Sequence, residues 1–189
     1  MWMVLEDILA NRNLGTEAVL HFSPEPFLES RLRASAKTYV GSDLIMRRVD
    51  VRSDLLALPF ADAAFDIVIA SYILQYVSDD ARALRELRRV LKPGGIALLP
   101  VTIVASSTIE YPEPNLNESG GHVRAPGVDY YDRYRSHFSA IELHPSQDYP
   151  ESSQPWVYED RTRWPTPQMP LRRPMPGIRH PEVIPVCTR

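Results

Sequence analysis

The run AAFDIVIAS, residues 63–71, constrains the fold more than any other part of the sequence. Its apolar residues are nearly continuous, whereas a strand with one solvated face alternates apolar and polar residues. Such a strand needs cover on both faces, as parallel strands have between two layers of helices. Residues 78–91 follow as the clearest predicted helix, because leucines recur on one face and a Pro-Gly-Gly stop comes directly after it.

The rest of the chain alternates in the same way between short apolar runs and helical patterns. Helices are predicted over residues 2–11 and 26–36. The other predicted strands are residues 18–22, TYVGSDLI with its end at Asp43, an extended segment that ends near Asp54, and residues 96–105, 138–144 and 182–189. Strands and helices at this spacing indicate βαβ units in a parallel sheet.

Length and composition bound the class of protein. With 189 residues, 44% of them hydrophobic, we expect residues 1–189 to form a single domain. The net charge of −3 gives no general attraction to nucleic acid, and no apolar run is long enough to span a membrane. The N-terminus is acidic where a signal peptide is basic, and Cys187 is the only cysteine, which suits a reducing compartment. We therefore expect a cytoplasmic protein with Cys187 buried in a strand.

Two segments break the alternation. Residues 106–134 are polar, and we expect a long loop that covers a substrate, with residues 130–137 as a candidate short helix. Prolines then crowd residues 145–181, a proline-rich arm between the last two strands. Because Trp156, Trp164 and other apolar side chains are interleaved with these prolines, we expect the arm to pack, either around its own chain or across a partner in a homodimer.

The segment DLLALPFADAAFDIVIASYILQYVSDDARALRELRRVLKPGG, residues 54–95, resembles the middle of a class I S-adenosylmethionine-dependent methyltransferase of the type 11 group. The shared motifs are an LPF-x-D-x-x-FD turn and an RVLKPGG helix end, and the match covers about residues 37–102. VLHFSPEP, GHVRAPGVDYYDRY and the terminal VIPVCTR resemble a subgroup with LHF-x-PE in place of the glycine-rich first turn. The resemblance implies an α/β, Rossmann-like, doubly wound sheet of about seven mostly parallel strands with helices on both faces.

A ligand in an open parallel sheet binds beyond the carboxyl ends of the strands, near the switch in strand order. By the resemblance, Asp43 accepts hydrogen bonds from the two ribose hydroxyls of S-adenosyl-L-methionine, Asp54 accepts from the adenine amino group, and the backbone of Leu55 meets a ring nitrogen. Ser71 and Tyr72 line the methyl-transfer face. The alternatives are turn or cap aspartates for Asp43 and Asp54, and simple packing for Ser71 and Tyr72.

The first turn has no glycine, which a dinucleotide needs so that backbone amides can approach its pyrophosphate. S-adenosylmethionine carries no phosphate, so side chains can hold part of it. Glu25 is a candidate acceptor for the cofactor's ammonium group or a favourable charge in the first turn of a helix. Ser23 is a candidate partner of its carboxylate or a helix cap, and His21 either faces the site or is a strand-end histidine with structural partners.

Methyl transfer from a sulfonium is an in-line displacement, so the protein must mainly place the acceptor and exclude water. A hydroxyl acceptor also needs a base. His122 is the candidate general base, with Tyr130 as a second candidate catalytic residue, although a loop histidine with a structural hydrogen bond is the alternative. Many relatives have a Glu-His pair where this chain has Gln75 and Tyr76. The five histidines lack zinc-like spacing, so we expect no metal.

The sequence thus predicts a S-adenosylmethionine-dependent methyltransferase that acts on a small molecule, with oxygen, nitrogen and carbon acceptors all open. One alternative keeps the fold but not the reaction, in small-molecule metabolism or binding. An RNA methyltransferase is disfavoured by the acidic balance and by the lack of an appended basic module.

Overall fold

The computed structural model describes residues 1–10, 12–115, 121–150, 152 and 182–189. The α-helices are α1 (Trp2–Leu9), α2 (Pro26–Ser35), α3 (Asp80–Val90) and α4 (Tyr130–Arg135), with short 3-10 turns at η1 (Leu14–Thr16), η2 (Leu74–Tyr76) and η3 (Ser146–Asp148). The strands are β1 (Ala18–Phe22), β2 (Thr38–Asp43), β3 (Val51–Arg52), β4 (Phe65–Ala70), β5 (Leu91–Leu98), β6 (Ile109–Asn115), β7 (His122–Ala125), β8 (Ala140–Pro145) and β9 (Val183–Thr188).

Seven strands form the main sheet in the order β3-β2-β1-β4-β5-β9-β8. Strands β1 to β5 pair in parallel, and β9 is antiparallel to both of its neighbours. The order of strands reverses between β1 and β4, which lie side by side although β2 and β3 intervene in the sequence. The predicted Rossmann-like α/β fold is confirmed, and its switch point lies at the carboxyl ends of β1 and β4.

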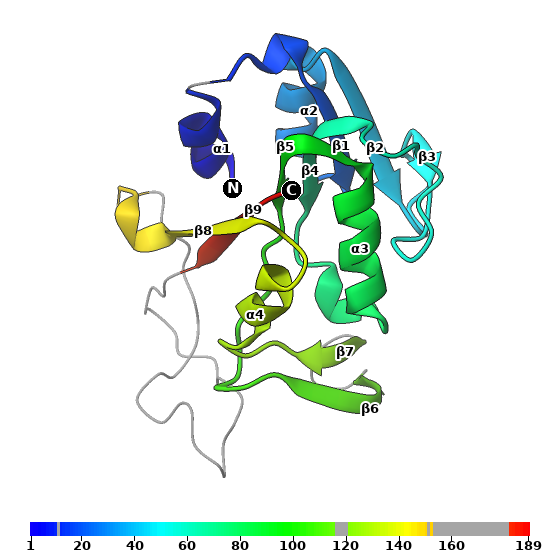
Figure 1. The fold of residues 1–189 in the computed structure, drawn as a ribbon, viewed down its shortest axis with the longest axis vertical. Coiled ribbons are helices and arrows are strands. Elements are labelled where there is room, and N and C mark those ends of the chain that lie inside the picture. Colours follow the sequence, from blue (N-terminus) through cyan, green and yellow to red (C-terminus); the bar gives the residue numbers. More distant parts are fainter. Residues whose placement is uncertain (11, 116–120, 151, 153–181) are drawn as a thin grey trace.

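The apolar residues of the central strands divide between two cores. Leu20, Val68 and Ala97 pack with α3 and α4 on one face, whereas the neighbouring Val19 and Ile67 pack with α1 and α2 on the other. Figure 1 shows α3 and α2 on opposite sides of the sheet. The continuous apolar pattern of residues 63–71 therefore has the predicted cause, because successive side chains of β4 enter different cores.

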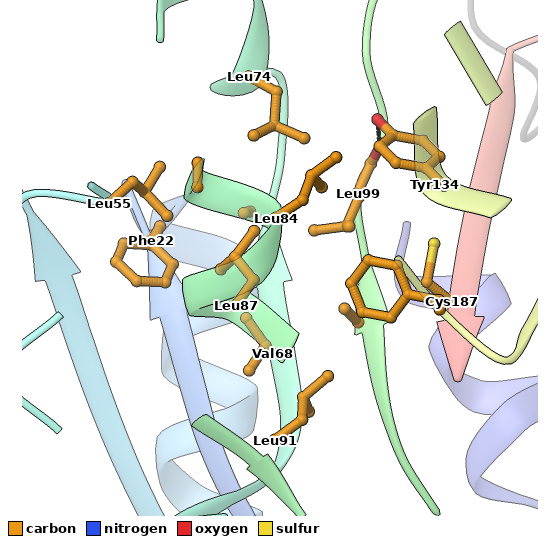
Figure 2. Close-up of a cluster of buried hydrophobic side chains, with 14 of the residues drawn as sticks. Phe22, Leu55, Val68, Leu74, Leu84, Leu87, Leu91, Leu99, Tyr134 and Cys187 are labelled. Atoms are coloured by element: carbon orange, nitrogen blue, oxygen red, sulfur yellow. Dashed lines mark hydrogen bonds between the residues drawn. The ribbon is translucent and has the colours of Figure 1, made fainter. Parts of the chain in front are cut away.

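Helix α3 shows how the local sequence produces the packing. Asp79 caps its N-terminus by accepting a hydrogen bond from the Arg82 backbone amide. Leu84 and Leu87 are fully buried, and Figure 2 shows them directed into the cluster that contains Phe22 and Val68. Burial of each leucine contributes roughly 1.5–3 kcal/mol. The helix ends at Val90, and the Pro-Gly-Gly that was expected to follow as a stop is part of β5 instead.

Residues 106–134 correct the prediction of a long loop. Strands β6 and β7 form a two-stranded antiparallel sheet, and α4 begins at Tyr130. Gly127 is required at the exit of this hairpin, because a Cβ there would lie 2.3 Å from the backbone carbon of Ser107. Figure 1 shows the hairpin beyond the main sheet, next to α4.

Most of the proline-rich arm, residues 145–181, lies outside the described residues, so its packing stays a prediction. Cys187 is fully buried in β9, as expected. Along the described chain, no helix has the length and apolar character needed to cross a membrane.

Candidate active site

A cavity of about 470 Å³ opens at the carboxyl ends of β1, β2 and β4. This volume is within the range of about 300–1,000 Å³ that is usual for small-molecule sites. Its walls combine a few polar side chains with a larger apolar surface. The lining residues are Phe22, Ser23, Asp43, Leu44, Ile45, Ser53, Asp54, Leu55, Ser71, Tyr72, Ile73, Tyr76 and Val77. Six of the predicted site residues, namely Ser23, Asp43, Asp54, Leu55, Ser71 and Tyr72, are therefore brought together here.

Asp43 ends β2 with its carboxylate fixed in the cavity wall. Oδ1 accepts from the backbone amides of Ile45 and Met46, both at 2.8 Å, and Oδ2 accepts from the Ser23 hydroxyl. Burial works to raise the pKa of Asp43, but these hydrogen bonds and the charge of Arg52 outweigh it, so the pKa lies below its ordinary value. The site therefore presents an ionised carboxylate, which accepts hydrogen bonds and donates none.

Ser23 and Tyr72 have backbone conformations that normally favour glycine. Their φ angles are +46° and +56°, and they follow β1 and β4 at the switch point. Left-handed conformations at such residues cost on the order of 1–3 kcal/mol and occur mostly where the surrounding structure imposes them. Backbone hydrogen bonds hold both residues, from the Ser23 amide to the Ser42 carbonyl and from the Tyr72 amide to the Pro100 carbonyl, each 2.8 Å. The first turn thus adopts a left-handed position without a glycine.

The wall at the ends of β2 and β3 is mainly apolar. Asp54 is exposed and its Oδ1 accepts from the Leu56 amide at 2.9 Å, while Leu55 is buried beside Phe22, as Figure 2 shows. Leu44 and Ile45 lie on the same wall and are 57% and 78% exposed. They were not among the site residues predicted from the sequence. Two large apolar side chains directly after a site aspartate were the signal that could have identified them, because a flat aromatic ligand needs such surfaces.

Among the described residues that line the cavity, Ser71 carries the one buried side-chain polar atom that makes no hydrogen bond, its Oγ. It is close enough to Glu25 to contribute to lowering the pKa of that carboxyl group. A buried hydroxyl without a partner costs about 1–3 kcal/mol, so the arrangement favours a ligand that hydrogen-bonds there.

Glu25 and His21 do not line the cavity. Glu25 precedes α2, and its Oε2 lies 2.8 Å from Nε2 of His21. Burial works to raise the pKa of Glu25, but the hydrogen bond from His21 and further interactions outweigh it, so this pKa is lowered. His21 is fully buried with both ring nitrogens hydrogen-bonded, which corrects its predicted role as a direct cofactor ligand.

His122 belongs to β7 and is not among the residues that line the cavity. Oε1 of Gln75 accepts from the Thr102 amide at 3.0 Å, which directs the Gln75 NH₂ group to Nε2 of His122, also at 3.0 Å. Nε2 therefore accepts a hydrogen bond, and burial lowers the pKa of the ring. The ring packs edge-on against Tyr76, a cavity residue, with centroids 4.5 Å apart. The observed contacts of His122 are those of the structural alternative.

Tyr130, the other candidate catalytic residue, is fully buried in the core. Its hydroxyl donates to Oδ2 of Asp80 at 2.7 Å. Because the side chain is enclosed and does not line the cavity, it does not reach a molecule bound there, and the predicted role is corrected. As for metals, the described part of the chain has no group of three or more His, Cys, Asp or Glu side chains placed to hold an ion.

This seven-stranded sheet, with a ligand-sized cavity at its switch point, is the fold that the chain shares with solved S-adenosylmethionine-dependent methyltransferases. A family model described as a methyltransferase domain matches residues 13–99, which include β1 to β5 and all the residues that line the cavity. The resemblance predicted from the sequence is confirmed.

Two curated relatives match about half of the chain. Over 103 residues, 52% of this chain, it is 34% identical to the ubiquinone/menaquinone biosynthesis C-methyltransferase UbiE of Idiomarina loihiensis and covers 40% of that protein. The identity to the UbiE of Pasteurella multocida is 37% over 103 residues, with 37% of that protein covered. The chain thus matches about two-fifths of the length of these relatives.

Solved structures show the same fold. A S-adenosylmethionine dependent methyltransferase from Mesorhizobium loti has a TM-score of 0.64 at 20% identity, over 100% of this chain and 97% of that one. The [4+2]-cyclase SpnF has a TM-score of 0.54 at 25% identity, over 75% of this chain and 60% of that one. The fold therefore accompanies more than one kind of reaction among its similar structures.

Proposed function

We propose that this protein transfers a methyl group from S-adenosyl-L-methionine to a small molecule. The observation that carries this proposal is the fixed, ionised carboxylate of Asp43 in the wall of a ligand-sized cavity at the switch point. Two backbone amides occupy its Oδ1 and the Ser23 hydroxyl donates to its Oδ2, which keeps acceptor capacity for a ribose hydroxyl.

The residues present fit this cofactor from one end to the other. Asp54 and the backbone of Leu55 would meet the adenine edge, and the apolar Leu44 and Ile45 would cover its faces. Ser23, Ser71 and Glu25 would hold the amino acid end, where the unpartnered Ser71 hydroxyl is an observation that points to a polar ligand group. When bound, S-adenosylmethionine supplies an electrophilic methyl group on a sulfonium.

In such a reaction the protein mainly positions the acceptor against the methyl group and excludes water. Tyr72 and Tyr76 line the cavity beside Ser71 and would contact the cofactor or the acceptor. His122 would act as a base only after its Nε2 left the Gln75 amide, so an acceptor that needs no base, or one deprotonated before it binds, suits the observed geometry better.

The acceptor atom stays open between oxygen, nitrogen and carbon. The UbiE relatives are named as C-methyltransferases of quinone biosynthesis, which favours a carbon acceptor on a small aromatic molecule. We further propose that the protein works in the cytoplasm without nucleic acid or membrane partners, and that it forms a homodimer.

Calorimetry with S-adenosylmethionine and S-adenosylhomocysteine tests the cofactor assignment. We expect both to bind, and Asp43→Asn to weaken the affinity at least about tenfold, because a charge-assisted hydrogen bond is worth about 1.5–3 kcal/mol. Asp62→Asn is the matched control, since its exposed carboxylate pairs with Arg89 away from the cavity and should change nothing. Absence of binding by the unmodified protein would refute the proposal.

A second candidate keeps the cofactor site but not the transfer. The similarity to the [4+2]-cyclase SpnF and the glycine-free first turn are the observations that favour it. Incubation with methyl-labelled S-adenosylmethionine and a panel of quinol, phenol and amine acceptors separates the two. Tight cofactor binding with no labelled product across the panel would favour this candidate.

The RNA methyltransferase alternative is tested separately, and RNA binding at low salt would favour it.

A further inference from the structure

His21 forms the middle of a chain of hydrogen bonds that joins Glu25 to Tyr39. Its Nε2 lies 2.8 Å from Oε2 of Glu25, and its Nδ1 lies 3.0 Å from the hydroxyl of Tyr39. The lowered pKa of Glu25 keeps its carboxylate ionised at neutral pH, and an ionised carboxylate only accepts. Nε2 therefore carries the ring proton and donates, so that in the neutral ring Nδ1 accepts from Tyr39.

Tyr39 is itself held in place from β2. Its ring meets the His21 ring edge-on with centroids 6.0 Å apart, and the Arg33 guanidinium lies 4.5 Å over its face. Glu29 and Asp50 both bind Arg33, at 2.8 and 2.9 Å. The Tyr39 hydroxyl stays neutral because burial raises its pKa, so it remains available as the donor to His21. These contacts fix the Tyr39 end of the hydrogen-bond chain, which is the end far from the cavity.

The other end of this chain lies next to the cavity. The Glu25 side chain is 47% exposed, and it lies near the unpartnered hydroxyl of Ser71 in the cavity wall. An exposed glutamate samples several rotamers and loses side-chain entropy when a ligand fixes one of them. A hydrogen bond from an immobile, fully buried histidine fixes the carboxylate before any ligand binds.

We propose that His21 is a positioning residue: with Tyr39 behind it, His21 holds the Glu25 carboxylate beside Ser71, where it receives the ammonium group of bound S-adenosylmethionine. This inference rests on the proposed function and adds a role for two residues that do not touch the cofactor. A glycine-rich turn binds its ligand with backbone amides. Here the side chains of Tyr39 and His21 hold that of Glu25 in the position in which it binds the ligand.

The test compares two ligands by calorimetry. S-adenosylhomocysteine carries the amino acid end, and 5′-methylthioadenosine has the adenosine and sulfur but no ammonium group. We expect His21→Phe and Glu25→Gln each to weaken S-adenosylhomocysteine about tenfold and to leave 5′-methylthioadenosine within about twofold, since one charge-assisted contact is lost. His21→Gln keeps an amide donor and should recover part of the loss. His137→Phe is the control, because this histidine bonds only locally, to Ser136 and Arg133.

A double variant tests whether His21 acts through Glu25. In the Glu25→Gln background, His21→Phe should weaken S-adenosylhomocysteine by less than about twofold further, because coupled residues are not additive. If His21→Phe fails to fold, Tyr39→Phe is measured instead, with an expected selective loss of about threefold.

Equal losses for both ligands in the His21 or Tyr39 variants would mean a purely structural role and would overturn the inference, as would no loss for either. The outcome for the proposed function is separate, because it fails only if the unmodified protein binds neither ligand.

Discussion

Replacement of Arg124 is expected to destabilise the protein more than any surface charge change. Only 2% of Arg124 is exposed. Its side chain reaches from β7 to the turn between η2 and α3. It donates to the carbonyls of Leu74 and Val77 at 2.6 Å and to that of Ser78 at 3.0 Å. Its Nε lies 3.0 Å from Glu110.

Arg124→Met keeps much of the side-chain volume but removes the side-chain donor from the buried carbonyls of Val77 and Ser78. The Leu74 carbonyl keeps the Val77 amide, and Glu110 keeps Arg133. Each unsatisfied buried group costs about 1–3 kcal/mol, and water that enters offsets part of this. Loss of one partner from a buried ionic network typically costs about 3–5 kcal/mol, and we expect a loss in this range. Such a loss is a large share of a typical domain stability of about 5–15 kcal/mol.

Urea denaturation followed by circular dichroism measures this free energy of unfolding. Arg124→Lys should lie between the two proteins, because an ammonium group cannot reproduce the planar fork. Arg135→Met, which removes an exposed pair with Asp132, should change the free energy by less than about 0.5 kcal/mol. Since Val77 lines the cavity, Arg124→Met should also weaken S-adenosylhomocysteine. A loss below about 1 kcal/mol with an unchanged urea slope would refute the reasoning.

Three further predictions concern other sites. Burial raises the pKa of the Cys187 thiol, so native protein should not react with a chromogenic disulfide reagent until denaturant unfolds it; fast native reaction would contradict the fold of β9. Burial lowers the pKa of His122, so the unfolded state binds its proton first and stability should fall as pH drops below about 6.5; urea titrations at several pH values should show a smaller fall for His122→Gln. Asp79→Ala should cost about 1 kcal/mol in urea unfolding by removing the α3 cap, while an unchanged midpoint would show that the cap contributes nothing.

Part of the site could be predicted from the sequence because it follows directly from strand ends. Asp43, Asp54 and Ser71 each lie at or just after the end of a strand, and the carboxyl ends of parallel strands meet at one edge of a sheet. The cavity indeed contains all three. Their roles toward a cofactor stay proposals, since position at a strand end gives proximity and not a bound atom.

The strand pair β6–β7 escaped prediction for a local reason. The residues of β6, IEYPEPN, contain two prolines and only partly buried or exposed side chains, so they show no apolar run. In a two-stranded sheet each strand is an edge, and an edge strand tolerates proline. Arg124 connects this pair to the rest of the fold, but its three carbonyl acceptors are 46 to 50 residues away in sequence, so no local pattern indicates the contact.

The sequence by itself determined the alternation of strands and helices, because apolar periodicity and caps are local properties. It also determined which carboxylates stand at strand ends. Only the tertiary structure decided that His21 is enclosed between Tyr39 and Glu25, that Tyr130 belongs to the core, and that His122 accepts from Gln75. Hydrogen-bond partners and burial depend on residues far apart in the chain, and no local pattern encodes them.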